Sequence, residues 1–174
     1  MPRRQTAPVL TPSPWIERFT PVIEPGSTAL DLACGAGRHS RLLIGCGIHV
    51  VGVDRDLSGV AELVDHPSFT GLKRDLESGE MPDIGRDGFD AVIVTNYLHR
   101  PLLEWIVEVV APGGVLLYET FAAGNERFGR PSCADYLLRP GELLEVARGK
   151  LRVLAFEDLE LDDRVIQHIA ARRD

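Results

Sequence analysis

The sequence places an acid inside an apolar run, a glycine-bearing turn directly after it, and a second acid 19 residues beyond the turn's first glycine. Asp31 lies within the run 28–33, Gly35 and Gly37 follow in the turn, and Asp54 ends the next apolar run. Glycine lets the main chain approach a ligand closely, and an acid that ends the second strand accepts hydrogen bonds from ribose hydroxyls. The pattern predicts a site for a nucleoside-bearing cofactor.

The spacing of the glycines argues against a dinucleotide cofactor. The dinucleotide fingerprint G-x-G-x-x-G needs a third glycine at position 40, where this chain has Ser40. That fingerprint also gives no role to Asp31, and an acid inside a strand is costly unless it is hydrogen-bonded or paired. The chain further lacks a Tyr-x-x-x-Lys proton-donor set. These features disfavour a nicotinamide oxidoreductase.

Residues 31–37, Asp-Leu-Ala-Cys-Gly-Ala-Gly, resemble motif I of the class I S-adenosylmethionine-dependent methyltransferases, an acid followed by Gly-x-Gly-x-Gly. Ala33 stands where the first glycine of the family is usual. The resemblance implies S-adenosylmethionine as cofactor and S-adenosylhomocysteine as product, with Asp31 serving the amino-acid end and Asp54 the ribose. An ordinary strand–turn–helix, with Asp54 as a helix N-cap, is the structural alternative.

The resemblance also implies cofactor contacts after the third and fourth strands. Asp75 would read the adenine amino group and the Leu76 amide a ring nitrogen, with a surface turn as the alternative. Asn96 would border the cofactor, and Arg55, which lies beside Asp54 in the sequence, is a candidate to stack on or cover the adenine. The residues expected to bind the cofactor are Asp31, Ala33, Cys34, Gly35, Gly37, Asp54, Arg55, Asp75, Leu76 and Asn96.

His99 and Tyr97 are the candidates for catalysis. Methyl transfer is an in-line displacement, so the enzyme aligns the reacting groups and removes a proton where one is needed. His99 follows the fourth strand, and histidine is a common general base near neutral pH. Tyr97 offers a hydroxyl or a shaping ring; capping or packing is the alternative for both. Neither proline of the Asn-Pro-Pro-Tyr motif is present, which disfavours the methyltransferases that act on amino groups of nucleobases or glutamine.

The segment 121–140 is a long connection without a clear periodic pattern, and such loops in compact domains are usually functional. Glu119 precedes it at the predicted acceptor pocket. Within it, Arg127, Phe128 and Arg130 are candidates to clamp a small anionic or planar acceptor and to act as a lid. The alternative is that these arginines pair with the surplus carboxylates of the chain.

Strand and helix patterns alternate along the chain, which predicts a doubly wound α/β fold with helices on both faces of the sheet. The resemblance implies a Rossmann-like, mostly parallel sheet of seven strands whose last strand runs antiparallel. Strands are expected at 28–33, 48–53, 69–73, 89–95, 115–120, 151–156 and 164–170, and helices from Ser13–Pro14, at 39–46, near 57–64, from Pro101 to Val110 and at 142–148.

Composition limits the partners. The 174 residues predict a tail at 1–12 and one domain at 13–174. A net charge of −7 argues against nucleic acid, and no apolar run reaches the roughly 20 residues that cross a bilayer, so we expect no membrane partner. An odd number of cysteines without metal-type spacing predicts no metal site and a reducing cytoplasm. They are Cys34, Cys46 and Cys133.

We therefore expect a cytoplasmic S-adenosylmethionine-dependent methyltransferase that acts on a small-molecule acceptor. The absence of a larger recognition domain favours a small acceptor, and the compact form is similar to the tellurite-resistance and thiopurine-type methyltransferases. A non-catalytic protein that binds S-adenosylmethionine or another nucleoside is the alternative. The acceptor, the methylated atom and the oligomeric state are left open.

Overall fold

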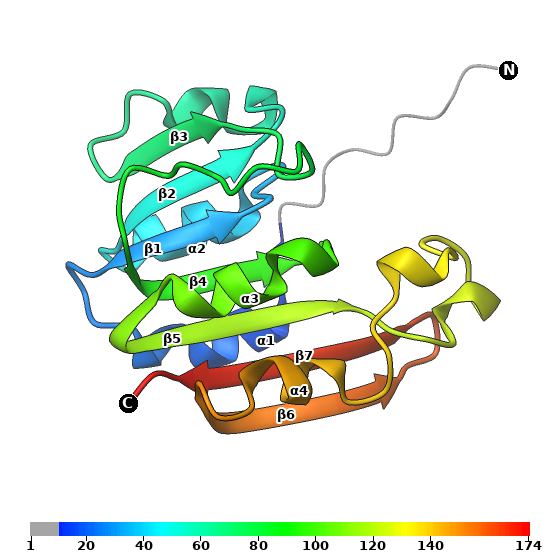
Figure 1. Ribbon diagram of the computed structural model, residues 1–174. Coiled ribbons are helices and arrows are strands. Elements are labelled where there is room, and N and C mark those ends of the chain that lie inside the picture. Colours follow the sequence, from blue (N-terminus) through cyan, green and yellow to red (C-terminus); the bar gives the residue numbers. More distant parts are fainter. Residues whose placement is uncertain (1–10) are drawn as a thin grey trace, which may run out of the picture.

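The computed structural model describes residues 11–174, and strands form its centre (Figure 1). Each apolar run that predicts a strand lies in one. The tail expected at 1–12 falls outside the described residues except for its last two. The strands of the described range are β1 (Thr28–Leu32), β2 (His49–Asp54), β3 (Phe69–Lys73), β4 (Phe89–Thr95), β5 (Val110–Phe121), β6 (Arg152–Glu160) and β7 (Val165–Arg172).

These strands form one sheet in the order β3-β2-β1-β4-β5-β7-β6. Strands β1 to β5 pair in parallel, whereas β7 lies antiparallel between β5 and β6. The tight connection at Asp162 and Asp163 closes the β6–β7 hairpin. The strand order reverses between β1 and β4, which is where open α/β sheets bind ligands. The predicted fold, including its antiparallel last strand, is confirmed.

Helices cover both faces of the sheet (Figure 1). The helices α1 (Pro14–Phe19) and α2 (Arg38–Gly45) pack on one face, and α3 (Leu103–Glu108) and α4 (Glu142–Ala147) on the other. Successive strand residues point to opposite faces, so the sheet contributes to two apolar clusters. No described helix is long and apolar enough to cross a membrane. Short 3₁₀ segments connect the elements: η1 (Thr20–Val22), η2 (Ser58–Leu63), η3 (Arg100–Leu102), η4 (Asn125–Arg127) and η5 (Ala134–Tyr136).

Local signals decide where the first helices begin and end. The Ser13 hydroxyl accepts a hydrogen bond from the Trp15 amide at 3.1 Å, and Pro14 occupies the first helical position. Gly47 follows α2 with a φ of 77°, the left-handed conformation that commonly ends a helix. Both features agree with the sequence prediction.

Two elements differ from the sequence prediction. The helix expected near 57–64 is the 3₁₀ segment η2, in which Val60 has a non-helical φ of −124°. Val110, expected on a helix face, begins β5, and the turn expected after it belongs to the same strand. Gly114 allows this, because a Cβ at that position would lie 2.8 Å from the Phe89 carbonyl oxygen of β4.

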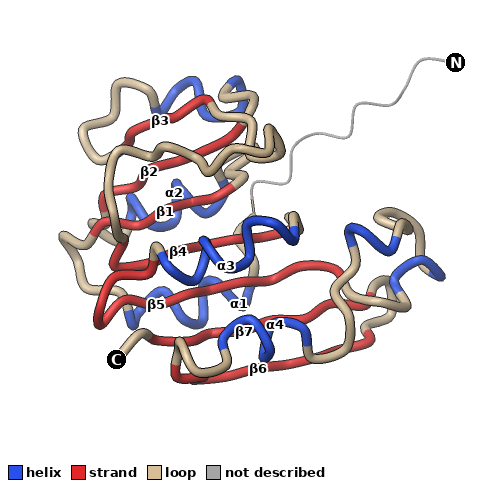
Figure 2. The backbone as a smooth tube through the Cα atoms, in the orientation of Figure 1, coloured by secondary structure: helices blue, strands red, loops and turns tan. Residues whose placement is uncertain are grey.

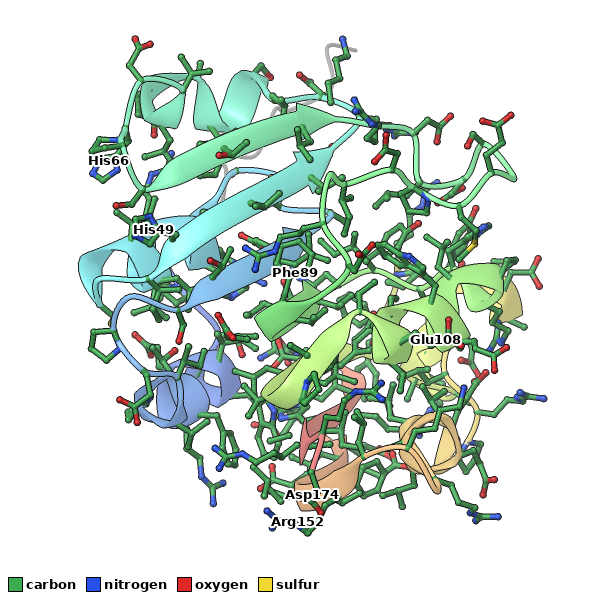
Figure 3. All side chains as sticks on the ribbon, turned by 60° about the vertical axis from the view of Figure 1, so that its left-hand side comes forward. His49, His66, Phe89, Glu108, Arg152 and Asp174 are labelled. Atoms are coloured by element: carbon green, nitrogen blue, oxygen red, sulfur yellow. The ribbon has the colours of Figure 1, made fainter. Side chains whose placement is uncertain are left out.

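Figure 3 shows which polar side chains lie away from the site. His49 and His66 are exposed at the amino ends of β2 and β3, opposite the edge where those strands finish. Arg152 and Asp174 pair at 3.0 Å and join the start of β6 to the last residue of the chain. Phe89, in contrast, is fully buried at the start of β4.

Candidate active site

The strands β1 to β5 finish at one edge of the sheet, toward which their arrowheads point in Figure 1 and where the loops that follow them lie in Figure 2. Three cavities of about 400, 210 and 220 Å³ lie along this edge. Each shares lining residues with the next, so they form one continuous cleft. A cleft of this kind offers adjoining space for two small ligands.

The first cavity, of about 400 Å³, lies over the ends of β1 to β3. Half of the residues expected to bind the cofactor line it. Arg74, Glu77 and Tyr136 line it as well and were not anticipated; the first two flank an expected pair, whereas no local pattern marks the tyrosine. The lining residues are Ala33, Asp54, Arg55, Arg74, Asp75, Leu76, Glu77, Tyr97 and Tyr136.

The Asp54 carboxylate is held in place by the turn beside it. Its Oδ2 atom accepts a hydrogen bond from the Gly35 amide at 2.9 Å, and its Oδ1 atom accepts one from the Asp56 amide at 3.0 Å. A carboxylate has about four lone-pair positions, so two remain for a ligand. Asp54 is therefore an oriented hydrogen-bond acceptor at the wall of the first cavity.

The glycine turn is packed more tightly than its sequence shows. Gly37 has a φ of 70°, and a Cβ there would lie 2.3 Å from a Val60 methyl group. A Cβ at Gly59 would lie 2.7 Å from the Gly35 carbonyl oxygen, so η2 presses on the turn through a second glycine. Ala33 adopts a φ of 55°, which is unfavourable for a residue with a Cβ. This explains why a glycine is usual at that position of the motif.

Asp31 lies in the core and lines none of the three cavities. Its carboxylate accepts a hydrogen bond from the Ser40 hydroxyl at 2.6 Å, which ties β1 to α2. Burial raises the pKa of Asp31 to about 6, and the Ser40 hydrogen bond opposes that rise. The hydrogen bond between Asp31 and Ser40 therefore helps to position the glycine turn that lies between β1 and α2. Cys34, Gly35 and Gly37, also expected to bind the cofactor, line no described cavity either.

Asp75 and Leu76 follow β3, and both line the first cavity. The Asp75 side chain is exposed, whereas the Leu76 side chain is buried. The Asp75 carboxylate accepts a hydrogen bond from the Glu77 amide at 2.9 Å, which closes a tight turn. The pair therefore presents a carboxylate and an apolar surface next to each other, as a polar ring such as adenine requires.

The second cavity, of about 210 Å³, lies over the ends of β4 and β5. Rings and aliphatic groups dominate its wall. The Tyr97 hydroxyl is buried without a hydrogen-bond partner in the described structure, and burial raises the pKa of Tyr97 above its ordinary value. The hydroxyl is therefore protonated near neutral pH. The lining residues are Glu77, Asn96, Tyr97, Leu98, Thr120, Phe121, Pro131 and Tyr136.

Asn96 joins the second cavity to the third and has a φ of 53°, a left-handed conformation that asparagine tolerates better than most residues. Glu119 lines the third cavity, where its carboxylate accepts a hydrogen bond from the Ser13 hydroxyl at 2.7 Å. Nε2 of the buried His168 lies 3.6 Å from the same carboxylate. Burial lowers the pKa of His168, although Glu119 and Glu157 oppose that effect.

The remaining walls of the third cavity come from both ends of the described chain. Thr11 and Pro12 belong to this wall, although the sequence predicts a domain that starts at residue 13. The cavity also carries two cations, from α2 and from the β6–β7 turn. The lining residues are Thr11, Pro12, Ser13, Pro14, Arg38, Asn96, Glu119, Phe121, Arg164 and Ile166.

The loop residues expected to bind the acceptor lie outside the three cavities. Arg127 donates a hydrogen bond to Glu160 at 2.8 Å, and its guanidinium lies 5.4 Å from the centre of the Phe128 ring. Both residues are exposed, as is Arg130. The Arg127 contact is the carboxylate pairing that stood as the alternative. A clamp made of these side chains would require the loop to move.

His99 is half-buried and precedes η3, but it lines none of the described cavities. Tyr97, the other catalytic candidate, lines the first and second cavities at their junction. The structure thus brings Tyr97, and not His99, to the place where two ligands would meet. A base role for His99 stays a prediction.

Arg100 and Glu142 fix the wall that carries Tyr136, and sequence reasoning missed both. The Arg100 guanidinium donates to both Glu142 oxygens, at 2.8 and 3.0 Å, and to the carbonyl oxygens of Asp135 and Leu137, at 2.9 and 2.8 Å. Burial alone would raise the pKa of Glu142, but the hydrogen bonds from Arg100 and Arg139 lower it to about 2. The pairing spans 42 residues, so no local pattern reveals it.

The structure also gives His39 a role that the sequence did not reveal. It lies buried on α2, where Nε2 accepts a hydrogen bond from the Ser13 amide at 3.1 Å and Nδ1 lies 3.2 Å from the Thr95 hydroxyl oxygen. Burial, followed by the nearby Arg38 charge, lowers the pKa of His39 to about 4. A neutral imidazole thus links the start of α1 to the end of β4.

The first cavity fits the adenosyl part of S-adenosylmethionine. Its volume of about 400 Å³ falls within the range of small-molecule sites. Asp54 supplies oriented acceptors for hydroxyl groups, and Asp75 with Leu76 supplies a polar and apolar surface for a ring. The carboxylates of Asp54, Asp75 and Glu77 also suit a ligand that carries a positive sulfonium.

Comparisons with known sequences point to the same chemistry. Residues 29–114 match the family model described as a methyltransferase domain. The ribosomal protein L11 methyltransferases of Burkholderia mallei and Burkholderia pseudomallei are each 35% identical to the chain over 104 residues, 58% of its length. The chain spans only 33% of the length of these curated relatives.

Solved structures share the fold at low sequence identity. TehB from Haemophilus influenzae is similar with a TM-score of 0.72 and 20% identity, over 91% of this chain and 61% of that protein. A TehB-like S-adenosylmethionine-dependent methyltransferase from Corynebacterium glutamicum has a TM-score of 0.66 and 20% identity, over 92% and 87%. The 1,6-didemethyltoxoflavin-N1-methyltransferase of Burkholderia thailandensis, with S-adenosylhomocysteine bound, has a TM-score of 0.67 and 15% identity, over 92% and 78%.

Proposed function

We propose that this chain, which belongs to the class I S-adenosylmethionine-dependent methyltransferases, transfers the methyl group to a small-molecule acceptor. One observation carries the proposal. A cavity walled by oriented acids continues into a smaller, ring-lined cavity across the shared residues Glu77, Tyr97 and Tyr136. Two adjoining pockets are what a transfer between two bound molecules requires.

We infer that the first cavity holds the adenosyl group. Asp54 would accept hydrogen bonds from the ribose, Asp75 and Leu76 would hold the adenine, and Arg55 would cover it. Asn96, where the second cavity adjoins the third, would border the reacting groups. S-adenosylmethionine supplies a methyl group on a positively charged sulfur, and an acceptor lone pair bonds to the methyl carbon as the carbon–sulfur bond breaks and its electrons stay on sulfur.

In this reaction, the residues of the chain would mainly align the acceptor with the methyl group, and proton transfer would be secondary. The protonated Tyr97 hydroxyl would donate a hydrogen bond to the acceptor and fix its orientation. Glu119, held by Ser13, would be available to receive a proton in the third cavity. A proton released elsewhere in the cleft would pass to solvent.

A protein acceptor is the second candidate, because the curated relatives at 35% identity are named for methylation of a ribosomal protein. The volume of the second cavity, about 210 Å³, favours a small ring over a chain segment. The net charge of −7 favours neither nucleic acid nor an anionic membrane surface as partner. Unpaired cysteines are consistent with a cytoplasmic location, which we propose as well.

The binding role of Asp54 is tested by titrating S-adenosylhomocysteine into the Asp54→Asn protein. The substitution keeps the side-chain shape but removes its charge and half of its acceptor capacity. We expect the binding free energy to weaken by about 1–3 kcal/mol, the usual effect of leaving hydrogen-bonding groups unpaired. Calorimetry measures this directly.

Asp65→Asn is the matched control, because Asp65 is exposed and lines none of the described cavities. It should bind S-adenosylhomocysteine as the unaltered protein does. Equal affinity in the Asp54 and Asp65 variants would contradict the ribose assignment. Absence of binding in the unaltered protein would contradict the proposed function itself.

A further inference from the structure

The second cavity is lined by groups that suit a flat ring. Tyr97, Phe121 and Tyr136 contribute aromatic side chains, and Leu98 and Pro131 contribute aliphatic ones. Aromatic side chains bury large apolar areas and favour stacked or edge-on contacts with other rings. Its volume of about 210 Å³ limits the occupant to a small molecule.

No arginine, lysine or histidine is among the residues that line this cavity. Two arginines of the neighbouring segments are engaged elsewhere. Arg127 donates to Glu160 at 2.8 Å and to the Gly124 carbonyl oxygen at 3.0 Å. Arg100 donates to the Glu142 carboxylate and to main-chain oxygens. An anion in the second cavity would therefore find no positive partner among the residues that line that cavity.

Among the described residues, the one charged side chain that lines the second cavity is acidic, whereas the first cavity carries three carboxylates together with Arg55 and Arg74. Glu77 lines both the first and second cavities, and Asp54 and Asp75 line the first. Like charges within a few ångströms of each other repel, and the repulsion grows as water is excluded from the cleft. An oxyanion would therefore be rejected, whereas a neutral or cationic ring would not.

The Tyr97 hydroxyl is a buried polar group that the described structure leaves without a partner. A buried, unpaired hydroxyl is costly, so a ligand atom that accepts its hydrogen bond gains affinity. Because Tyr97 lines both cavities, this partner atom would lie at their junction. That is where the methylated atom of an acceptor belongs.

We propose that the methyl acceptor is a small planar ring compound, neutral or cationic, with a hydrogen-bond-accepting atom that meets the Tyr97 hydroxyl. The proposal rests on the function proposed above and narrows it. The sequence prediction that Arg127 and Arg130 clamp the acceptor also allowed small anions, and this proposal does not. Oxyanions and aromatic carboxylates are excluded from the second cavity.

Three matched probes test the charge preference: quinoline, quinoline-4-carboxylate and protonated 4-(aminomethyl)quinoline. Each is titrated into the full chain loaded with S-adenosylhomocysteine, and affinity is measured by calorimetry or saturation-transfer NMR. We expect quinoline and the amine to bind at least tenfold more tightly than the carboxylate. Carboxylate binding that equals or exceeds that of quinoline overturns the proposal, and so does the failure of all three to bind.

Variants locate the binding. Tyr97→Phe should weaken quinoline binding by about threefold to tenfold, because one hydrogen bond is lost while the ring remains. Glu77→Gln should reduce the preference for the amine over the carboxylate. Arg164→Gln, in the third cavity, is the control and should change neither value. Probe binding that responds to Arg164→Gln but not to Tyr97→Phe overturns the proposal.

Titration of S-adenosylhomocysteine alone distinguishes a failure of the proposed methyltransferase function from a failure of the proposed acceptor class. If that ligand does not bind, the proposed function fails and this inference fails with it. If it binds and the loaded protein prefers the carboxylate, the proposed function stands and only the acceptor class is overturned.

Discussion

The cofactor motif of this chain departs from its family pattern at one side chain, and the structure shows the consequence. Ala33 has a φ of 55°, a conformation that costs residues with a Cβ roughly 1–2 kcal/mol. The Ala33 side chain also faces the first cavity. The fold tolerates this strain because β1 is paired on both sides, with β2 and β4. Strain of this kind persists where the surrounding structure determines the backbone.

Replacement of Ala33 by glycine should stabilise the protein. Relief of the left-handed strain outweighs the added flexibility of the unfolded chain, so we expect a gain of about 1 kcal/mol in the free energy of unfolding. Chemical denaturation measures the change. Ala29→Gly, within β1 and with a buried Cβ, is the control and should destabilise the protein. A loss of stability in Ala33→Gly would refute the strain argument.

At the scale of the elements, the segment between β5 and α4 forms part of the wall of the second cavity, where we place the acceptor. It supplies Pro131 and Tyr136 to the second cavity, yet it contains only the two short 3₁₀ segments η4 and η5. Its order comes from outside, through the Arg100–Glu142 pair and the hydrogen bonds from Arg100 to main-chain oxygens. A long loop is thereby made into a fixed wall.

Arg100→Gln should loosen this wall. Removal of Arg100 leaves the buried Glu142 carboxylate with the mostly exposed Arg139 as its cationic partner, and we expect a loss of about 3 kcal/mol in the free energy of unfolding. Hydrogen exchange of the Leu137 and Leu138 amides should accelerate. Arg148→Gln, which breaks the exposed pair with Glu145, should cost less than about 1 kcal/mol. Equal effects of the two substitutions would show that the Arg100 pair does not order the wall.

For the molecule as a whole, two buried titratable groups link folding to pH in opposite directions. The pKa of His39 is lowered to about 4, so its contribution to stability is present above pH 6.5 and lost as the pH falls toward 4. The pKa of Asp31 is raised from 3.8 to about 6, so its contribution is present below pH 3.8 and lost as the pH rises through 6. Between about pH 4 and 6 the two effects offset each other.

Single substitutions should separate these effects. His39→Asn removes the group that destabilises the fold on acidification, so its stability should fall less than that of the unaltered protein between pH 6.5 and 4.5. Asp31→Asn removes the opposing group, so its stability should fall more steeply. Each slope is expected to change by up to roughly 3 kcal/mol over the range, at 1.36 kcal/mol per pKa unit. Urea titrations at several pH values test this, and unchanged slopes would contradict it.

Much of the architecture could be predicted from local patterns. Apolar runs located all the strands of the described residues, and Ser13–Pro14 and Gly47 marked helix ends, because these signals act over a few residues. Prediction failed where distant chain segments approach each other. Val110 joins β5 instead of a helix because Gly114 allows close contact with β4.

The cofactor class could be identified from the sequence alone, because Asp31, the glycine turn and Asp54 lie close together along the chain and resemble a known methyltransferase motif. Which groups meet at the acceptor side depends on tertiary packing. Tyr136 reaches Tyr97, and Arg100 reaches Glu142, across intervals of about 40 residues. Such contacts depend on the order of the strands in the sheet and on how the loops pack over its edge. Neither can be predicted from the local periodicity of the sequence.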